Sequence, residues 1–142
     1  MDGPEPLSSS LEDYLEVIFH LTSESTSARA KDIAARLGVR SPSVTGALRV
    51  LAARELVNYT PYGAITLTAK GDLAAREVVR RHEALKDFLE QVLGIAPAEA
   101  DDAACKMEHA VSRNILERFI EFADFVGAHP RIRRTWQDRL GP

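Results

Sequence analysis

A glycine and a serine-proline pair separate two short amphipathic stretches. These helix-ending and helix-starting residues limit the possible folds more than any other feature of the chain. Residues 31–37 have the apolar spacing of a helix, and Gly38 follows where a left-handed residue commonly ends one. Ser41 is a good N-cap and Pro42 a good first residue for a second helix running to about residue 54. The inward face of this second helix would consist of Val44, Ala47, Leu48 and Leu51. Two helices joined by a tight turn with glycine predict a helix-turn-helix.

The segments on either side extend this prediction. Residues 8–22 repeat apolar side chains at helical spacing, and the run from Ser10 to Asp13 is similar to a capping box at a helix start. Residues 56–59 and 64–67 resemble two short strands around a Pro-Tyr-Gly turn. Three helices followed by a two-stranded β-wing predict a winged helix-turn-helix.

Three further helices are expected after the wing. Thr68 suits the N-cap of a long helix over residues 68–93, which Gly94 would end. A short turn leads into a second helix, and Ser112 can cap a third over residues 113–126. The buried face of the long helix would carry Leu73, Val78, Leu85, Leu89 and Val92.

The third of these helices has more apolar side chains than a small protein can bury alone. We expect a second copy of the chain to cover them. Gly127 and Pro130 should end this helix, and the tail over residues 131–142 receives no assignment. The apolar residues in question are Ile115, Leu116, Phe119, Ile120 and Phe122.

The middle helix of the three carries the clearest chemical signal. Residues 101, 105, 108 and 109 fall on one helical face, which bears Asp101, Cys105, Glu108 and His109. A thiol, carboxylates and an imidazole together are ligands for a divalent transition metal. Each one alone is more often a solvated acid, a small buried thiol or a hydrogen-bonded core histidine, so the motif by itself leaves both interpretations open. The flanking apolar stripe would consist of Ala100, Ala104, Met107 and Val111.

Charge and cysteine content narrow the class of protein. The formal net charge of −3 argues against a wholly basic nucleic-acid protein, but residues 27–62 carry six basic and two acidic side chains, a local net charge of +4. A single cysteine cannot form an internal disulfide, so Cys105 is a small buried residue, a reactive thiol or a ligand. The N-terminus has no signal-like apolar core and no run is long enough to span a bilayer, so we expect a cytoplasmic location.

The outward side of the predicted second helix of the helix-turn-helix suits DNA. Small hydroxyl and glycine surfaces with arginines at the edges would let its N-terminal turn approach bases and phosphates, although serine and threonine also commonly start helices. The expected DNA-contacting residues are Arg29, Arg40, Ser41, Pro42, Ser43, Thr45, Gly46, Arg49 and Tyr62.

With these motifs assembled, the chain resembles the diphtheria toxin repressor and manganese transport regulator family of metal-dependent repressors over residues 10–130. The run Ser10-Leu-Glu-Asp-Tyr-Leu-Glu16 is similar to the family's first helix, Arg81-His82-Glu83 to its linker helix, and Cys105-Lys-Met-Glu-His109 to its metal helix. The resemblance implies that residues 41–51 form the reading helix and that the last two helices form the dimer interface. It implies as metal ligands Asp13, Glu16, His82, Cys105, Glu108 and His109.

The resemblance is mixed at the positions that distinguish the family's branches. Asp13 is typical of manganese-responsive members and Cys105 of iron-responsive members, so Mn²⁺ or Fe²⁺ is expected, with one or two ions per chain. Lys86 stands where iron-responsive members place an acid of an ancillary site. A second site built in that way is therefore not expected, whereas acids shared between two close metals remain open.

These expectations define a fold class and a function. The fold is mainly α, with a winged helix-turn-helix DNA-binding domain over residues 1–72 and a helical metal-binding and dimerisation domain over residues 73–142, linked by the helix over 68–93. The function is a metal-dependent repressor of metal-homeostasis genes, which is not an enzyme. Its partners are an operator in double-stranded DNA and a second copy of the chain, with no membrane and no small organic substrate.

Two other classes of function stay open from the residues alone. A winged-helix regulator could sense oxidation or a small molecule through Cys105. A carboxylate-bridged di-metal enzyme in a helical bundle expects paired Glu-x-x-His motifs, and the sequence contains none.

Overall fold

The computed structural model describes residues 6–24 and 28–142, and it divides the chain into two compact units. The N-terminal unit spans Met1–Val78 and the C-terminal unit spans Val79–Pro142. Residues 1–5 and 25–27 lie outside the described part of the chain. Among the residues that are described, no helix is both long and apolar enough to cross a membrane.

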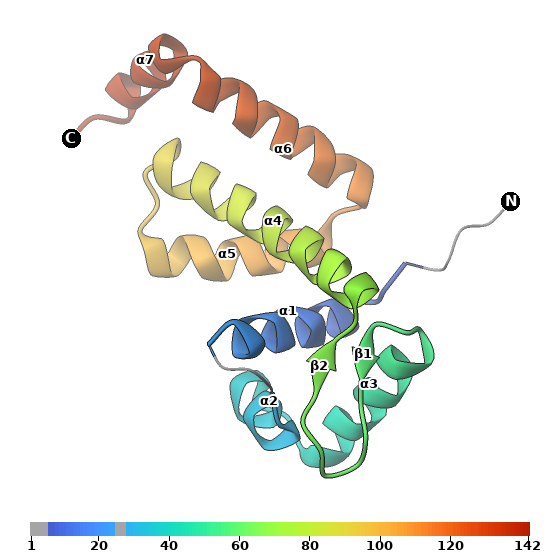
Figure 1. The fold of residues 1–142 in the computed structure, drawn as a ribbon. Helices are drawn as coiled ribbons and strands as arrows, with labels where there is room; N and C mark the ends of the chain where they lie inside the picture. Colours follow the sequence, from blue (N-terminus) through green and yellow to red (C-terminus); the bar gives the residue numbers. More distant parts are fainter. Residues whose placement is uncertain (1–5, 25–27) are drawn as a thin grey trace, which may run out of the picture. The chain divides into compact units, whose positions relative to one another are not determined.

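The N-terminal unit is a winged helix-turn-helix, as predicted (Figure 1). Its elements are α1 (Ser9–Glu24), α2 (Ala30–Leu37), α3 (Ser41–Ala53), β1 (Val57–Asn58), β2 (Thr66–Leu67) and the first part of α4 (Ala69–Gln91). The two strands pair antiparallel, with Val57 opposite Leu67 and Asn58 opposite Thr66. Backbone hydrogen bonds between Ala28 and Ile65 attach the segment before α2 to the wing.

The core of this unit is apolar, and helical spacing explains its membership. Each helix turns a face of residues three and four apart toward the other two helices, which removes that face from water. Fully buried side chains from the three helices and the wing are Leu15, Ile18, Ile33, Val44, Leu48, Leu51 and Ile65.

The turn between α2 and α3 is as predicted at Gly38 but not at Ser41. Gly38 has φ 65° and ψ 35°, the left-handed conformation that glycine adopts without steric cost. Arg40, with φ −85° and ψ 153°, holds the N-cap position of α3, so Ser41 is the first helical residue and the prediction of Ser41 as N-cap was wrong. Proline lacks only an N–H that the first helical turn leaves unbonded, so Pro42 is tolerated at the second position as well as the first.

The serine that caps α1 also differs from the prediction, although the helix begins within one residue of the predicted start. The hydroxyl of Ser8 accepts a hydrogen bond from the backbone N–H of Leu11 at 3.2 Å, whereas Ser10 lies inside the helix. Three consecutive serines offer the same cap, and the first one gives the longer helix. The capping box expected from Ser10 to Asp13 is therefore wrong, and Asp13 lies beyond the helix start.

The wing is shorter than the two predicted strands. A turn closed by a hydrogen bond from Gly63 N–H to the Thr60 carbonyl oxygen at 3.0 Å connects β1 and β2. Tyr62 occupies this turn with φ 63° and a fully exposed side chain.

The C-terminal unit is all helical, and the larger of its two apolar clusters lies among three helices. It contains the second part of α4, α5 (Pro97–Ala110), α6 (Arg113–Ala128) and α7 (Pro130–Leu140). Small side chains on α5 allow close packing in this cluster. Figure 1 shows α5 and α6 on either side of the yellow end of α4. The buried residues of this core are Leu85, Leu89, Ala100, Ala104, Leu116 and Ile120.

Two side-chain caps predicted for these helices are confirmed. The hydroxyl of Thr68 accepts a hydrogen bond from Gly71 N–H at 2.9 Å at the start of α4. The hydroxyl of Ser112 accepts one from Ile115 N–H at 3.3 Å at the start of α6. Each satisfies a backbone donor that the first helical turn leaves unbonded.

Leu73 contradicts the predicted buried face of α4, because its side chain is 71% exposed. Gly71 and Ala75 occupy the buried face at this end of the helix instead. A Cβ on Gly71 would lie 1.7 Å from the Leu56 carbonyl oxygen, so the helix approaches the wing as closely as only glycine permits. This close approach turns Leu73 outward.

The last part of the chain forms a helix where no element was assigned. Gly127 lies inside α6 rather than after it, and Pro130 begins α7. The indole N–H of Trp136 donates to the Val92 carbonyl oxygen at 3.0 Å, and the Gln137 side chain donates to the Gln91 carbonyl oxygen at 2.7 Å. Helix α7 thus satisfies carbonyl groups that the end of α4 leaves unbonded.

At the end of α5, Val111 contradicts its predicted place on the apolar stripe. It has an extended backbone and an exposed side chain. The helix stops at Ala110, so helical spacing no longer controls the direction of the next side chain.

Candidate metal centre and nucleic-acid interface

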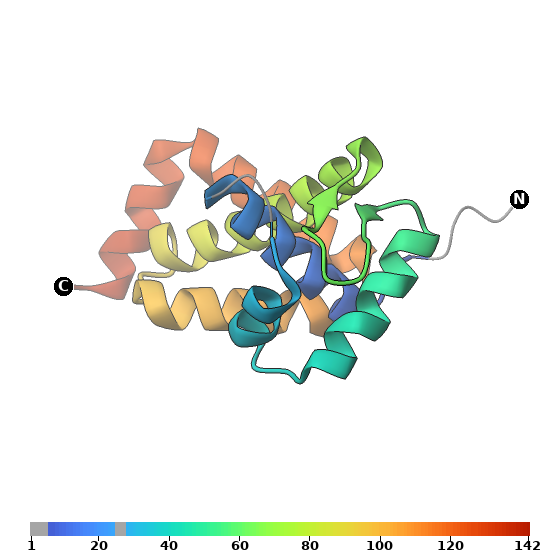
Figure 2. The ribbon, with the colours of Figure 1, turned by 60° about the horizontal axis from the view of Figure 1, so that its bottom comes forward.

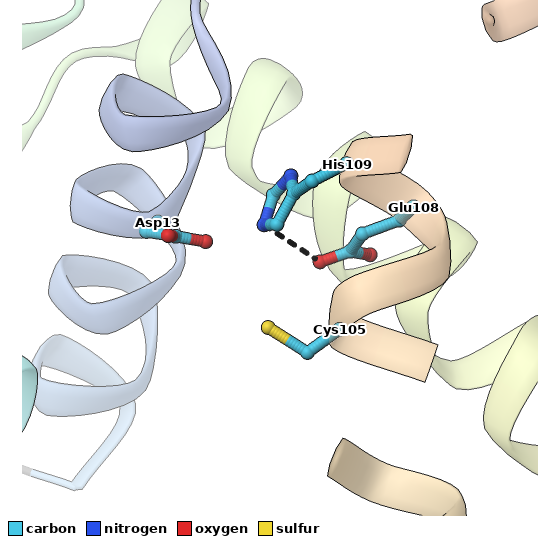
Figure 3. Close-up of side chains that lie close together, drawn as sticks. All are labelled: Asp13, Cys105, Glu108 and His109. Atoms are coloured by element: carbon cyan, nitrogen blue, oxygen red, sulfur yellow. Dashed lines mark ion pairs between the residues drawn. The ribbon is translucent and has the colours of Figure 1, made fainter. Parts of the chain in front are cut away.

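Helix α5 brings three chemically distinct side chains to one side. Figure 3 shows Cys105, Glu108 and His109 projecting from adjacent turns of α5, as residues three and four apart on a helix must. One ligand atom from each of these three lies within 4.8 Å of those of the other two. The Glu108 side chain is only 4% exposed, while Cys105 and His109 are half-buried.

Glu108 lies between two histidines. Its Oε1 is 3.6 Å from Nε2 of His109, the pair marked by the dashed line in Figure 3, and its Oε2 is 3.7 Å from Nδ1 of the buried His82 on α4. These separations exceed hydrogen-bond length. They match two ligands of one ion, because metal bonds of about 2.0–2.2 Å to nitrogen and oxygen leave ligand atoms no more than about 4.4 Å apart.

The environment of Glu108 tests whether these residues fit a metal. Its Oε1 is buried and accepts no hydrogen bond from any residue in the described part of the chain. Burying a carboxylate oxygen without a hydrogen bond or a cation costs free energy, so a positive charge between the two histidines would remove that cost. Thiolate, imidazole and carboxylate are ligands of first-row divalent metals. The side chains of His82, Cys105, Glu108 and His109 therefore fit such an ion.

Asp101 takes part in this cluster although it is absent from the predicted ligand set. Its Oδ1 lies 2.8 Å from Nε2 of His82 and 4.0 Å from Nζ of Lys86. Its spacing of four residues from Cys105 had placed it on the predicted stripe. The missing information was the pairing of α5 with α4, which the sequence of one helix does not contain.

The remaining two predicted ligands lie on α1, in the N-terminal unit. Asp13 and Glu16 are three residues apart and both are half-buried. Glu16 Oε1 is 3.7 Å from Nε2 of His20, one turn further along α1. Next to them, burial raises the pKa of the Tyr14 phenol above its usual range, so Tyr14 stays neutral at physiological pH.

The predicted DNA-contacting residues occupy exposed positions on the N-terminal unit. Arg40 precedes α3, and Ser41, Pro42 and Ser43 form its exposed first turn, which contains no acidic residue. That turn and the turn of the wing lie at the same lower end of the unit in Figure 1, and this end comes forward in Figure 2. The positive end of a helix dipole with arginines beside it attracts phosphate. The exposed members of the remaining set are Arg29, Gly46, Arg49 and Tyr62.

Thr45 is the exception among these residues, because it is half-buried. Its hydroxyl donates to the Ser41 carbonyl oxygen at 3.2 Å, a bond within the helix. One turn of α3 therefore holds the hydroxyl in place. Gly46 beside it is open, since an added Cβ would meet nothing within 4 Å.

Two family models match the chain and together cover most of it. Residues 6–65 match the iron dependent repressor N-terminal DNA binding domain. Residues 68–137 match the iron dependent repressor metal binding and dimerisation domain. The matched regions correspond to the winged helix-turn-helix and to the helices from α4 onward.

Individual relatives agree with these matches. The chain is 38% identical over 119 residues to an HTH-type transcriptional regulator of Methanocaldococcus jannaschii, covering 83% of this chain and 95% of that protein. It is 41% identical over 118 residues to the transcriptional regulator MntR of Escherichia coli, covering 83% of this chain and 76% of that protein.

A solved manganese-dependent transcriptional repressor in complex with manganese superimposes with a TM-score of 0.71 at 36% identity. The match covers 81% of this chain and 53% of that one. The chain thus spans about half the length of this solved regulator.

These matches bear on one of the two other classes of function that the residues left open. The matched domains are those of DNA-binding repressors, which speaks against the di-metal enzyme. The expected resemblance to the diphtheria toxin repressor and manganese transport regulator family is confirmed. The chain belongs to the iron-dependent repressor family, whose members are metal-dependent transcriptional repressors.

Proposed function

We propose that this chain represses metal-homeostasis genes when Mn²⁺ or Fe²⁺ is plentiful. The observation that carries the proposal is the buried carboxylate of Glu108 between His109 and His82, with an oxygen that accepts no hydrogen bond from the described residues. A site that is costly without a cation and complete with one suits a sensor, because loading then stabilises one conformation over others.

The proposed ligands come from three helices. Asp13 and Glu16 on α1, His82 on α4, and Cys105, Glu108 and His109 on α5 would hold the metal, as the likeness to the family's motifs implies. A divalent ion bound to all of them supplies a link between the DNA-binding residues 1–72 and the metal-binding and dimerisation residues 73–142. That link would restrict the spacing of the two reading heads of a dimer to one that fits a palindromic operator.

The preference of the site for Mn²⁺ or Fe²⁺ depends on two proposed ligands that favour different metals. Asp13 adds a hard oxygen that suits Mn²⁺, and the Cys105 thiolate adds a soft sulfur that favours later metals. One or two ions per chain are compatible with this set. Matching Cys105→Glu and Asp13→Met variants would separate the two contributions, with the first moving preference toward Mn²⁺ and the second toward Fe²⁺.

On DNA, the first turn of α3 would enter the major groove. Arg40, Ser43 and Arg49 would contact phosphates or base edges. Arg29, at the N-cap position of α2, and Tyr62, in the turn of the wing, would contact the flanking DNA backbone. A DNA partner and a thiol ligand that must stay reduced both point to the cytoplasm as the location.

Anaerobic fluorescence anisotropy tests the proposal directly. The full chain is titrated onto labelled DNA from upstream of its own gene, with chelator, with Mn²⁺ and with Fe²⁺. We expect binding with at least one ion and none with chelator. His109→Ala should abolish the response to metal, whereas His129→Ala should retain it, because Nδ1 of His129 bonds to the Phe125 carbonyl oxygen one turn back on α6.

Binding that ignores chelator and both ions would contradict the proposal. If DNA binding instead changed with peroxide in the presence of chelator, the Cys105 thiol would be the sensor and the acids would have a structural role.

A further inference from the structure

We propose that Asp101 is a positioning residue that presents Nδ1 of His82 to the metal and takes no part in ligation itself. The inference rests on the proposed metal function and adds to its ligand set one acid of α5 that acts from outside it. Its evidence lies entirely within the C-terminal unit, in the contacts among His82, Lys86, Asp101 and Glu108.

The hydrogen bond between His82 and Asp101 fixes the position of a proton. A carboxylate offers only acceptors, so the 2.8 Å contact requires His82 Nε2 to carry the hydrogen and donate it to Asp101 Oδ1. In a neutral imidazole the lone pair then lies on Nδ1. That atom faces Glu108 Oε2 at 3.7 Å, so an imidazole nitrogen and a carboxylate oxygen both direct electron pairs into the same space.

Lys86 holds the carboxylate in place. The Asp101 side chain is more than half exposed, and an exposed aspartate ordinarily exchanges among rotamers and bonds to water. The Lys86 ammonium lies 4.0 Å from the same Oδ1 that accepts from His82. Attraction between these charges, one turn of α4 beyond His82, opposes the rotation that would take Asp101 away from the ring.

The same charge makes Asp101 unsuitable as a ligand. A cation beside Oδ1 would have to displace the Nε2 proton and approach the Lys86 ammonium, and like charges at such distances repel. Pairing a ligand histidine with a carboxylate on its far nitrogen fixes the ring's tautomer and raises its basicity. Asp101 therefore serves the metal through His82.

The neighbouring Asp102 provides a matched control. It carries the same charge on the next residue of α5, but its carboxylate accepts from Lys106 at 2.8 Å, on the exposed side of the helix. That hydrogen bond raises the pKa of Lys106, together with the charge of Asp102. Removing Asp102 changes the net charge of the unit by the same amount without touching His82.

Metal affinity and the state of the His82 ring are measured on the full chain. Loss of the free Mn²⁺ electron paramagnetic resonance signal gives the dissociation constant for wild type, Asp101→Ala, Asp101→Asn and Asp102→Ala. Asp101→Ala should bind about 10–100-fold more weakly, the usual effect of losing such a partner, and Asp102→Ala within about twofold of wild type. Asp101→Asn keeps an acceptor oxygen and should fall between them.

¹⁵N nuclear magnetic resonance, with Zn²⁺ as a diamagnetic probe, measures which nitrogen of the His82 ring binds metal and which carries the proton. In wild type, Zn²⁺ should shift His82 Nδ1, while Nε2 keeps its proton. A purely structural role for Asp101 would change stability but not this pattern, and circular dichroism shows whether each variant is folded.

A coordination shift on His82 Nε2, or equal affinity of Asp101→Ala and Asp102→Ala, would overturn the inference and leave the proposed function intact. Normal metal binding with this ring pattern but no effect of metal on DNA would overturn the proposed function alone. A wild-type chain that binds neither Mn²⁺ nor Zn²⁺ would overturn both the inference and the proposed function.

Discussion

The two units bury different kinds of side chain, although each is built mainly from helices. The N-terminal unit fills its core with aliphatic residues such as Leu15, Ile33 and Leu48, all fully buried. The buried charged or histidine side chains of the described chain are Arg81, His82 and Glu108, and all three belong to the C-terminal unit.

This difference separates two ways of carrying a function. In the N-terminal unit the proposed DNA contacts, apart from the half-buried Thr45, are exposed on the surface, and the aliphatic core itself has no proposed part in binding DNA, so that core can be optimised for stability. In the C-terminal unit the proposed ligands are part of the interior, where a charge without a partner is costly. Stability in that unit should therefore depend on what is bound, and three variants test this contrast.

The largest expected effect is on the apolar core. Leu48→Ala should lower the free energy of unfolding by about 2–5 kcal/mol, because Leu48 is fully buried and the cavity left behind closes only in part. Urea unfolding in the presence of chelator measures the loss. Val50→Ala on the same helix should change stability by less than about 0.5 kcal/mol, because Val50 is exposed. Equal effects of the two substitutions would contradict the described core of α3.

A smaller effect is expected at the charged interior, and it should appear only with metal. At 100 times its dissociation constant, a bound ion raises the free energy of unfolding by about 2.7 kcal/mol. Glu108→Gln keeps the shape of the side chain but removes the charge, so this gain should disappear. Thermal unfolding with chelator and with Mn²⁺ measures it.

Glu99→Gln is the control for that experiment, because Glu99 is an exposed acid in the first turn of the same helix. The control should keep the full gain from Mn²⁺. Retention of the gain in Glu108→Gln would remove Glu108 from the proposed ligands.

The smallest effect should separate stability from binding in the N-terminal unit. Gly46→Ala places a Cβ in open space inside α3, so it should stabilise the protein by about 0.5–1 kcal/mol. The same methyl group lies on the proposed DNA surface and should weaken operator binding in the anisotropy assay.

Gly127→Ala is the counterpart in the other unit. Its Cβ also meets nothing within 4 Å, near the end of α6, so a similar or smaller gain in stability is expected without any change in DNA affinity. Unchanged DNA affinity in Gly46→Ala would argue against α3 as the reading helix.

The sequence predicts best where one residue determines the local backbone. Gly38, Thr68 and Ser112 were identified correctly as helix ends, because a left-handed glycine and a capping hydroxyl depend on neighbours within four residues. The error at Ser10 arose because three consecutive serines could supply the same cap, whereas at α3 the N-cap position falls on Arg40, which makes no side-chain cap. The three serines at the start of α1 can form the same capping hydrogen bond, so the sequence alone does not rank them.

Features that depend on packing between helices were harder to predict. Leu73 has the correct spacing for a buried residue, yet the close approach of Gly71 to Leu56 turns it outward. The contact of Asp101 with His82 joins residues nineteen positions apart, and helix α7 depends on the end of α4. The six ligands and the nine DNA contacts remain predictions, because a ligand set also requires the ion and the operator.

The bond from Trp136 to the end of α4 gives this protein a built-in optical probe. The sequence contains one tryptophan, so its intrinsic emission arises from a single indole whose N–H is held by the Val92 carbonyl oxygen. Trp136 is 38% exposed, and release of α7 would expose the rest of its indole to water and move the emission to longer wavelength, whereas a rearrangement confined to the wing would leave the emission unchanged. The emission wavelength of unlabelled protein thus distinguishes a conformational change at α7 from one confined to the wing.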